Sequence, residues 1–323
     1  MPRVLSGVQP SGQLHLGNYA GAIKQFVDLQ QTNEMFVFVA SYHALTSLRD
    51  AAVLRANARQ VVVDYLAFGL DPARTSIYLQ QDVPEVTELA WLLSCVCPMS
   101  WMEKAVSYKD KVAKGLSANV GLFTYPILQA ADILAVDANL VPIGKDQVQH
   151  IELTRDIAAR FNEEFKTEVF ILPAYRLAPD AGVLPGTDGE KMSKSYGNTI
   201  DPFLDEKALR KVCMSIKADS TPLEQPKNPD TDATFAIFRA IAGAADPRTV
   251  ELAAKYRAGG FGYGHAKQAL FELLLDHFGP ARQRRAALMA DPAYVDGVLR
   301  AGAGKARALA RATVDRARAA VGL

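Results

Sequence analysis

The sequence predicts an α/β fold, with a Rossmann-like parallel sheet in a first domain and a second, all-helical domain. Short apolar strand candidates alternate with helical patterns in the first part of the chain, which is typical of a parallel sheet covered by helices. Later, Pro-rich joints such as 221–232 separate helical patterns. The 323 residues, 49% of them apolar, suffice for about two structural units. We expect the first domain to span 1–196 and the helical domain to span 197–292, with a C-terminal helix at about 293–323 returning to the first domain.

Each strand candidate is a short apolar run bounded by polar or turn-forming residues. In chain order these runs occur at 4–8, 35–40, 76–80, 140–143 and 169–173. After the first run, Tyr19, Ile23, Phe26 and Val27 recur at helical spacing, so a strand, a turn and a helix are expected there. Ligands of open parallel sheets bind beyond the carboxyl ends of the strands, so the turns that follow strands are candidate sites.

The first such turn is PSGQLHLGN, at 10–18. Gly12 and Gly17 allow the backbone to approach a ligand closely, and the unpaired N–H groups of a following helix attract phosphate. His15 would stabilise charge on the α-phosphate of a nucleotide by donating a hydrogen bond from its ring, without acting as a nucleophile. The alternative is a purely structural connection.

A second candidate for phosphate binding is the loop at 184–198, LPGTDGEKMSKSYGN, whose Pro and Gly residues predict irregular structure. Lys191 and Lys194 could neutralise a departing pyrophosphate, and Ser193 and Ser195 could donate hydrogen bonds to the same oxygens. The alternative is a solvated surface loop.

Gly144, Lys145 and Asp146 follow the strand candidate 140–143 and precede a helical pattern, so they too lie at a carboxyl strand end. The alternative for this turn is an ordinary helix N-cap formed by Asp146.

Asp132 is a carboxylate in an otherwise apolar helical segment, TYPILQAADIL at 124–134. A buried charge needs a partner, and an indole N–H of a ligand would be one. The alternative is a structural ion pair on a half-exposed helix.

Together, the first turn and the KMSKS loop resemble the paired motifs of class I aminoacyl-tRNA synthetases. Residues 124–134 and 141–162 are similar to the tryptophanyl branch of that family, and the similarity covers nearly the whole chain. The resemblance implies that L-tryptophan reacts with ATP and Mg²⁺ to give an adenylate, and that the tryptophanyl group then passes to the 3′-terminal ribose of tRNA(Trp). It further implies a homodimer, an anticodon-binding role for 197–292, and metal supplied only with ATP, with no protein-bound structural metal.

The same resemblance assigns roles to individual residues. Catalytic roles fall on Lys191, Lys194, His15, Lys109 and Lys111. ATP binding falls on Gln9, Pro10, Ser11, Gly17, Asn18, Gly144, Lys145, Asp146, Val183, Lys191, Met192, Ser193, Lys194 and Ser195. Tryptophan binding falls on Asp132, Tyr125, Gln147, His43, Gln129 and Gly7.

Three positions depart from the family pattern. Asn18 replaces the last His of the first motif, which the tryptophanyl branch tolerates. Gln129 stands where many members have Met, and Leu5 where an aromatic residue is frequent. We expect altered packing of the amino-acid pocket without a change of substrate.

The charge, the cysteines and the apolar runs of the sequence bear on its nucleic-acid contacts, on metal binding and on its location in the cell. The net charge of +1 excludes a polybasic tail, so RNA contacts must come from local patches. The segment from 281 onward has nine basic and three acidic residues, which could approach tRNA phosphates or form a solvated helix face. The three cysteines lack metal-ligand spacing, and neither a signal peptide nor a membrane-length apolar run is present. A cytoplasmic chain is therefore expected.

Three other functions fit parts of the sequence. A tyrosyl-tRNA synthetase would carry an additional small C-terminal RNA-binding module. A silent paralogue that binds tryptophan or tRNA commonly loses the lysine loop, which is intact here. A simpler nucleotidyltransferase would share the first turn but not the helical domain.

Overall fold

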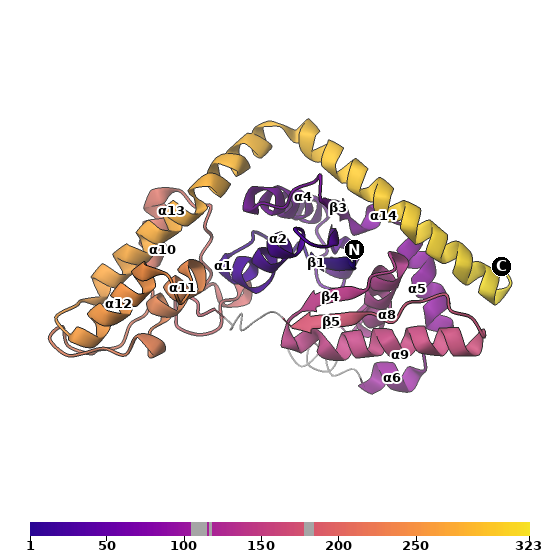
Figure 1. Cartoon of the computed structure of the whole chain (residues 1–323), viewed down its shortest axis with the longest axis horizontal. Helices are drawn as coiled ribbons and strands as arrows, with labels where there is room; N and C mark the ends of the chain where they lie inside the picture. Colours follow the sequence, from indigo (N-terminus) through magenta and orange to yellow (C-terminus); the bar gives the residue numbers. More distant parts are fainter. Residues whose placement is uncertain (105–114, 116–117, 178–183) are drawn as a thin grey trace. The chain divides into compact units, whose positions relative to one another are not determined.

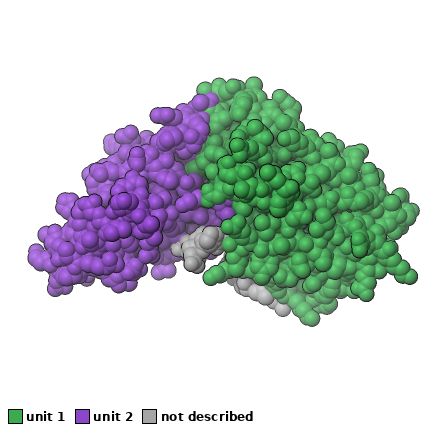
Figure 2. Space-filling view, in the orientation of Figure 1, with its two compact units in different colours: residues 1–12, 26–178, 288–323 green, residues 13–25, 179–287 purple. Residues whose placement is uncertain are grey.

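The computed structural model describes residues 1–104, 115, 118–177 and 184–323, and it divides into two units. Unit 1 comprises residues 1–12, 26–178 and 288–323, and unit 2 comprises residues 13–25 and 179–287 (Figure 2). Residues 13–25 and the KMSKS loop are therefore grouped with the helices of unit 2. The predicted division into a first domain that ends at residue 196 and a helical domain at 197–292 stays a prediction.

The strands of unit 1 form a five-stranded parallel sheet, which confirms the predicted α/β class. They are β1 (Arg3–Val8), β2 (Glu34–Val39), β3 (Thr75–Leu79), β4 (Leu140–Ile143) and β5 (Ala174–Leu177), in the order β3-β2-β1-β4-β5. Figure 1 labels β1, β3, β4 and β5. The chain moves outward from β1 to β3 and then returns to the other side of β1 with β4. The order thus reverses between β1 and β4, whose carboxyl ends form the switch point at which ligands of such sheets bind.

The strand predicted at 169–173 is wrong, since β5 begins five residues later, at Ala174. Val169 and Phe170 are buried in the core, which accounts for the apolar run. Asn162 pairs with Phe170 through two hydrogen bonds, one to its N–H and one to its C=O. This local pairing satisfies the backbone without a strand partner.

The helices of unit 1 surround the sheet. They are α3 (Ser41–Ala44), α4 (Ala51–Phe68), the 3₁₀ turn η2 (Gln80–Asp82), α5 (Glu85–Val96), α6 (Met99–Lys104), α8 (Val120–Ala135), the 3₁₀ turn η3 (Lys145–Gln147), α9 (Val148–Glu164) and α14 (Pro292–Val321). Side-chain caps fix two of the helix starts: Asp50 accepts from the backbone of α4, and Asn119 from that of α8. Such caps satisfy N–H groups that lack a partner within the helix.

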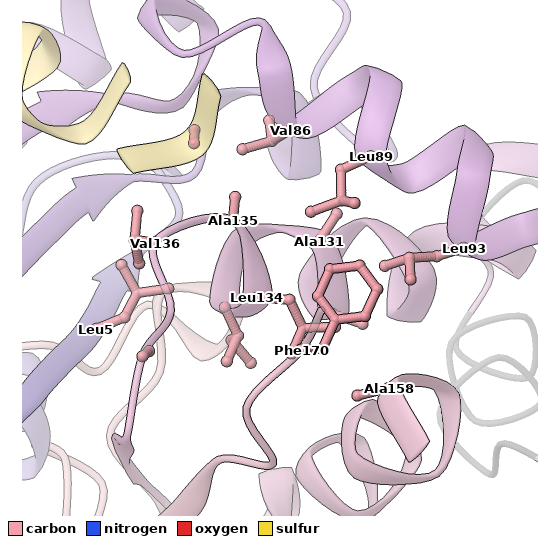
Figure 3. Close-up of a cluster of buried hydrophobic side chains, with 14 of the residues drawn as sticks. Leu5, Val86, Leu89, Leu93, Ala131, Leu134, Ala135, Val136, Ala158 and Phe170 are labelled. Carbon is pink, nitrogen blue, oxygen red and sulfur yellow. The ribbon is translucent and has the colours of Figure 1, made fainter. Parts of the chain in front are cut away.

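Helix α8 lies in the middle of the main apolar core of unit 1. In Figure 3, side chains of α5 such as Leu89 and Leu93 lie on one side of α8, and Ala158 of α9 lies on the other. Leu5, on β1, belongs to the same cluster. The residues of α8 that precede and follow Asp132 are therefore immobilised by packing from several elements.

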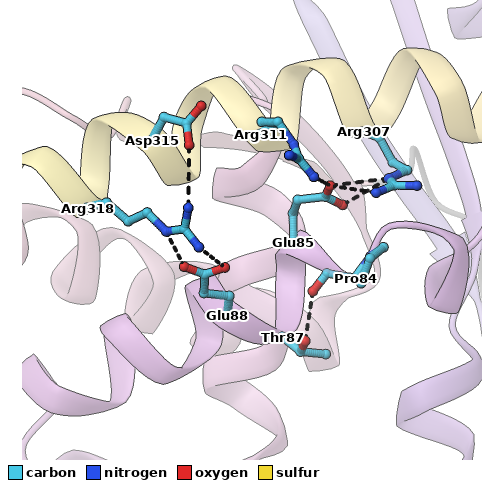
Figure 4. Close-up of polar contacts among 8 residues, drawn as sticks. All are labelled: Pro84, Glu85, Thr87, Glu88, Arg307, Arg311, Asp315 and Arg318. Carbon is cyan, nitrogen blue, oxygen red and sulfur yellow. Dashed lines mark hydrogen bonds and ion pairs between the residues drawn. The ribbon is translucent and has the colours of Figure 1, made fainter. Parts of the chain in front are cut away.

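Helix α14 packs against β3 and α5. A Cβ on Gly302 would lie 2.0 Å from the carbonyl oxygen of Ile77, so only glycine permits this approach of helix to strand. Arg307 and Arg311 both bind the buried carboxylate of Glu85, at 3.1 and 2.9 Å, and Arg318 binds Glu88 (Figure 4). Burial opposes ionisation of Glu85, but the hydrogen bonds from Arg311 and Arg307 outweigh it and hold its pKa below the usual value.

Unit 2 contains the helical segments α1 (Leu16–Asn18), the π-helical η1 (Tyr19–Ile23), the 3₁₀ turns η4 (Lys194–Tyr196) and η5 (Pro229–Thr231), α10 (Glu206–Met214), α11 (Ala233–Ala242), α12 (Pro247–Ala258) and most of α13 (Tyr263–Ala290). Helix α2 (Lys24–Leu29) continues η1. Asp205, Asp232 and Asp246 cap α10, α11 and α12. Asp232 also accepts a hydrogen bond from the buried hydroxyl of Tyr256, which ties α11 to α12. In the described part of the chain, no helix has both the length and the apolar character needed to cross a membrane.

The close approach at Gly302 gives a stability prediction with a control in the same helix. Gly302→Ala should destabilise unit 1 by roughly 1–3 kcal/mol, because the new methyl group overlaps the backbone of β3. Gly304→Ala should instead stabilise it by about 0.5–1 kcal/mol, since that position is exposed and alanine favours helix. Denaturant unfolding measures both changes, and equal effects at the two positions would contradict the packing argument.

Candidate active site

Several residues predicted to bind ATP lie at the carboxyl ends of β1 and β4. Gln9, Pro10 and Ser11 come directly after β1, and Gly144 comes directly after β4. A Cβ on Gly144 would lie 2.7 Å from Oδ1 of Asp146, so a larger residue there would displace the Asp146 side chain. Gly144 caps η3 and Gln147 caps α9. The alternative in which Asp146 is the N-cap is therefore wrong, and its carboxylate accepts from the side chain of Gln147 at 2.8 Å.

Asp132 is buried, with 3% of its surface exposed, which excludes the half-exposed ion pair considered above. Its carboxylate accepts a hydrogen bond from His43 Nε2 at 2.9 Å. The side-chain amide of Gln80 donates to both carboxylate oxygens, at 2.9 and 2.8 Å. Burial, with the negative charge of Asp132 adding to it, raises the pKa of the neighbouring Tyr78 well above its usual value, so the phenol stays protonated.

The other residues predicted to bind tryptophan also belong to unit 1, and one of them, His43, contacts this carboxylate directly. The ring of Tyr125 stands edge-on to that of His43, with 6.2 Å between the ring centroids, and the Tyr125 hydroxyl is 2.7 Å from Nε2 of His150. Gln129 makes a long contact of 3.4 Å with Gln147. Thus Gln129, the departure from Met, joins a polar chain that leads to Asp146.

Gly7 pairs with Phe38 across β1 and β2. A Cβ on Gly7 would lie 2.4 Å from the Phe38 carbonyl oxygen and within 3.0 Å of its ring. The absence of a side chain at Gly7 is what lets the Phe38 ring lie over β1. Phe38 in turn stacks on Tyr78, with 5.8 Å between centroids.

In unit 2 the structure brings the two predicted nucleotide motifs together. The N–H of Leu16 donates to the carbonyl of Ile200 at 2.9 Å. Met192 Sδ would be 3.6 Å from a Cβ on Gly17. Asn18 accepts from the backbone N–H of His15 at 3.1 Å, so the amide that replaces the motif's last His closes the turn locally.

His15 is buried beside this contact. Burial, with a smaller contribution from the charge of Lys194, lowers the pKa of His15 from 6.5 to about 4. The imidazole is therefore neutral at physiological pH. A neutral ring retains one N–H donor for a ligand and does not add to the positive charge of the lysines.

The KMSKS loop is organised by Asn198, which is buried. Its side-chain oxygen accepts from the N–H of Ser193, and its amide nitrogen donates to Asp188 and to the carbonyl of Lys191. The hydroxyls of Ser193 and Ser195 lie 2.8 Å apart. A Cβ on Gly186 would overlap Asn198, so that glycine makes room for the amide.

Lys109, Lys111 and Val183 lie outside the described residues. Two organising residues, Gln80 and Asn198, were absent from the sequence predictions. Gln80 ends the predicted strand 76–80, so its place at a carboxyl strand end was an available signal. Asn198 resembled an ordinary turn residue and gave none. Among the described residues, no group of three or more His, Cys, Asp or Glu side chains could hold a metal ion.

A parallel sheet with a buried acceptor beyond its strand ends, and a lysine–serine loop packed on a Gly-rich turn, define a class I aminoacyl-tRNA synthetase. Residues 1–279 match the family described as tRNA synthetases class I (W and Y), and the chain belongs to this family. The resemblance found in the sequence is thereby confirmed.

The chain is similar to tryptophan–tRNA ligases over its whole length. It is 52% identical to the one from Fusobacterium nucleatum, covering 100% of this chain and 98% of that protein. The ligase from Rhodopirellula baltica is 50% identical, with 99% of each chain covered. The crystal structure of tryptophanyl-tRNA synthetase from Campylobacter jejuni complexed with ADP and tryptophan is 48% identical and has a TM-score of 0.92, covering 99% of this chain and 100% of that one.

The lowered pKa of His15 predicts a pH-dependent loss of stability. The unfolded chain takes up a proton at His15 near pH 6.5, whereas the folded chain does so only near pH 4. Above pH 6.5, His15 is neutral in both states and does not change the free energy of unfolding. As the pH falls from 6.5 towards 4, only the unfolded chain gains the proton, so the free energy of unfolding decreases. His15→Asn should lose less stability than the wild type over this interval in denaturant unfolding. Lys194→Met should reduce the wild-type loss only in part, because burial remains; identical pH profiles for all three proteins would refute the assignment.

Proposed function

We propose that this chain is a tryptophan–tRNA ligase. It activates L-tryptophan with ATP to give tryptophanyl-adenylate and pyrophosphate, and transfers the tryptophanyl group to the 3′-terminal ribose of tRNA(Trp). The buried carboxylate of Asp132 is the observation that carries the proposal, because within the described residues its Oδ1 accepts from Gln80 alone and has the capacity for one further donor, such as an indole N–H. The names of the relatives that cover the whole chain support the same substrate.

Tryptophan recognition is assigned to unit 1. Asp132 accepts the indole N–H, while Tyr125 and Gln147 serve the ammonium group, and His43, Gln129 and Gly7 complete the surroundings of the side chain. Phenylalanine has no N–H or O–H on its ring, so it would leave Asp132 with an unmet acceptor. Sites built around a buried hydrogen bond reject such analogues by roughly 10⁴ or more.

Activation needs charge stabilisation and positioning rather than a protein nucleophile. The tryptophan carboxylate attacks the α-phosphate, and pyrophosphate leaves. Lys191 and Lys194 neutralise the departing oxygens, His15 donates one hydrogen bond, and Ser193 and Ser195 donate others. The predicted nucleotide contacts also include Gln9, Pro10, Ser11, Gly17, Asn18, Gly144, Lys145, Asp146 and Met192, together with Lys109, Lys111 and Val183 outside the described residues.

We propose that Mg²⁺ arrives bound to ATP. The KMSKS loop offers ammonium and hydroxyl groups, which bind phosphate oxygens and are poor ligands for a hard divalent cation. Bound to the triphosphate, the ion would supply further charge stabilisation for the leaving group.

Transfer to tRNA is assigned to a cytoplasmic homodimer in which the helical region after residue 196 contacts the anticodon. Arg307 and Arg311 of the basic C-terminal segment share the carboxylate of Glu85, and Arg318 pairs with Glu88, so these arginines also have a structural role within unit 1.

The test is amino-acid-dependent exchange of pyrophosphate into ATP, with tryptophan and tyrosine offered separately and without tRNA. Exchange with tryptophan alone supports the proposal. Exchange with tyrosine would favour the tyrosyl branch of the family. The absence of exchange with either would identify a silent paralogue.

Removal of one loop lysine should slow this exchange without unfolding the chain. Lys194→Ala is expected to lower the rate by about 10² or more, because the ammonium group acts on charge that develops in the transition state. Lys207→Ala, at an exposed position of α10, is the matched control and should retain the wild-type rate. Full activity of Lys194→Ala would remove that lysine from the catalytic residues.

A further inference from the structure

Gln80 holds Asp132 from a different strand of the sheet. It begins η2, directly after β3, and its side chain is completely buried. Its amide nitrogen lies 2.9 Å from Oδ1 and 2.8 Å from Oδ2 of Asp132. Its amide oxygen accepts from the backbone N–H of Tyr42 at 2.8 Å, and makes a longer contact of 3.4 Å with that of His43.

These partners fix which way the amide of Gln80 points. The groups of α3 that contact the Gln80 side chain are the backbone N–H groups of Tyr42 and His43. An N–H group can only donate, so the amide oxygen of Gln80 must be the atom that points towards α3. The NH₂ group must then face the carboxylate, since the reverse orientation would oppose donor to donor and oxygen to oxygen. The adjacent residue Gln81 is also tied to α3, through the hydroxyl of Ser41. Backbone N–H groups of α3, the helix that follows β2, therefore set the orientation of the Gln80 amide, and the ligand is not needed for it.

The hydrogen bonds divide the two oxygens of Asp132 into different roles. Oδ2 accepts from both His43 and Gln80. Within the described residues, Oδ1 accepts from Gln80 alone. A carboxylate oxygen can accept two hydrogen bonds, so Oδ1 retains the capacity for one further donor.

We propose that Gln80 is a positioning residue for tryptophan recognition, which locks the Asp132 carboxylate so that Oδ1 receives the indole N–H. This inference rests on the proposed function and adds a residue to it. Without the amide, only His43 would orient the carboxylate, and the acceptor would be free to turn away from the ligand. The loss would fall on the N–H contact and not on the packing of the indole ring.

That distinction can be measured with a ligand that lacks the N–H. In β-(3-benzothienyl)alanine, sulfur replaces the indole N–H while the ring keeps nearly the same shape. For the wild type and for Gln80→Met, which preserves side-chain length, pyrophosphate exchange gives the Michaelis constant for tryptophan and the inhibition constant of the analogue against tryptophan. We expect the variant to raise the constant for tryptophan by roughly tenfold and to leave that for the analogue within about twofold, as for loss of a charged hydrogen bond.

A general structural role of Gln80 would instead weaken both ligands alike, and an unchanged ratio of the two constants overturns the proposal. Gln60→Met is the matched control, because Gln60 on α4 also donates its side-chain amide to a carboxylate, that of Asp64 at 2.8 Å, and has no assigned role in ligand binding. It should leave the ratio at the wild-type value. If Gln80→Met does not fold, Gln80→Ala also removes the amide, because its side chain is too short to reach Asp132, and the ratio must shift in the same direction.

The outcomes also separate this inference from the proposed function. A wild-type chain that does not exchange pyrophosphate with tryptophan contradicts both. A wild type that activates tryptophan, but shows the same ratio as its Gln80 variants, leaves the ligase intact and removes Gln80 from recognition.

Discussion

A buried negative charge is the constraint on which the rest of unit 1 depends. Asp132 lies on α8, whose neighbouring residues belong to the main apolar core. An ionised carboxylate in such surroundings costs several kcal/mol unless hydrogen bonds replace its water. The donors come from segments that follow two adjacent strands: His43 lies beyond β2 and Gln80 beyond β3. The parallel sheet brings these carboxyl ends side by side, so the fold supplies donors where the core itself has none.

The position of Gln80 depends in turn on α14, the C-terminal helix, which packs against the strand that Gln80 follows. Strand β3 is at the edge of the sheet and has one strand neighbour, β2, so its position requires support from a helix. Helix α14 gives that support through the close contact at Gly302 and through the two arginines on Glu85, five residues after Gln80. Removing either arginine would leave the other to balance a buried carboxylate. The basic C-terminal residues thus have a structural use in holding the strand that delivers a site residue.

The sequence predicted features that depend on local patterns and missed those that depend on distant partners. Four strands were predicted correctly because their apolar runs are also their buried segments. The run at 169–173 was misleading, because Asn162 satisfies the backbone of Phe170 and leaves the apolar side chains in the core without a strand. The apolar neighbours of Asp132 left both burial and a half-exposed ion pair open, and its partner Gln80 is 52 residues away, with no local pattern to connect the two. The same holds for Asn198, whose role depends on a loop that folds back on it.

In unit 2, the residues predicted to bind the nucleotide combine charged lysines with a neutral histidine, which limits repulsion between neighbouring cations. A triphosphate calls for positive charge, yet several cations close together repel one another before the ligand arrives. Lys191 is exposed, so water screens its charge in the free protein. His15 is buried beside Lys194, and burial together with that lysine keeps its imidazole neutral. The lysines of the loop can therefore provide positive charge, while His15 provides a directed hydrogen bond. Because its imidazole is neutral, it does not repel the lysines. A histidine is therefore compatible with the first turn, where a buried ammonium group would oppose the close packing of Gly17 and Met192.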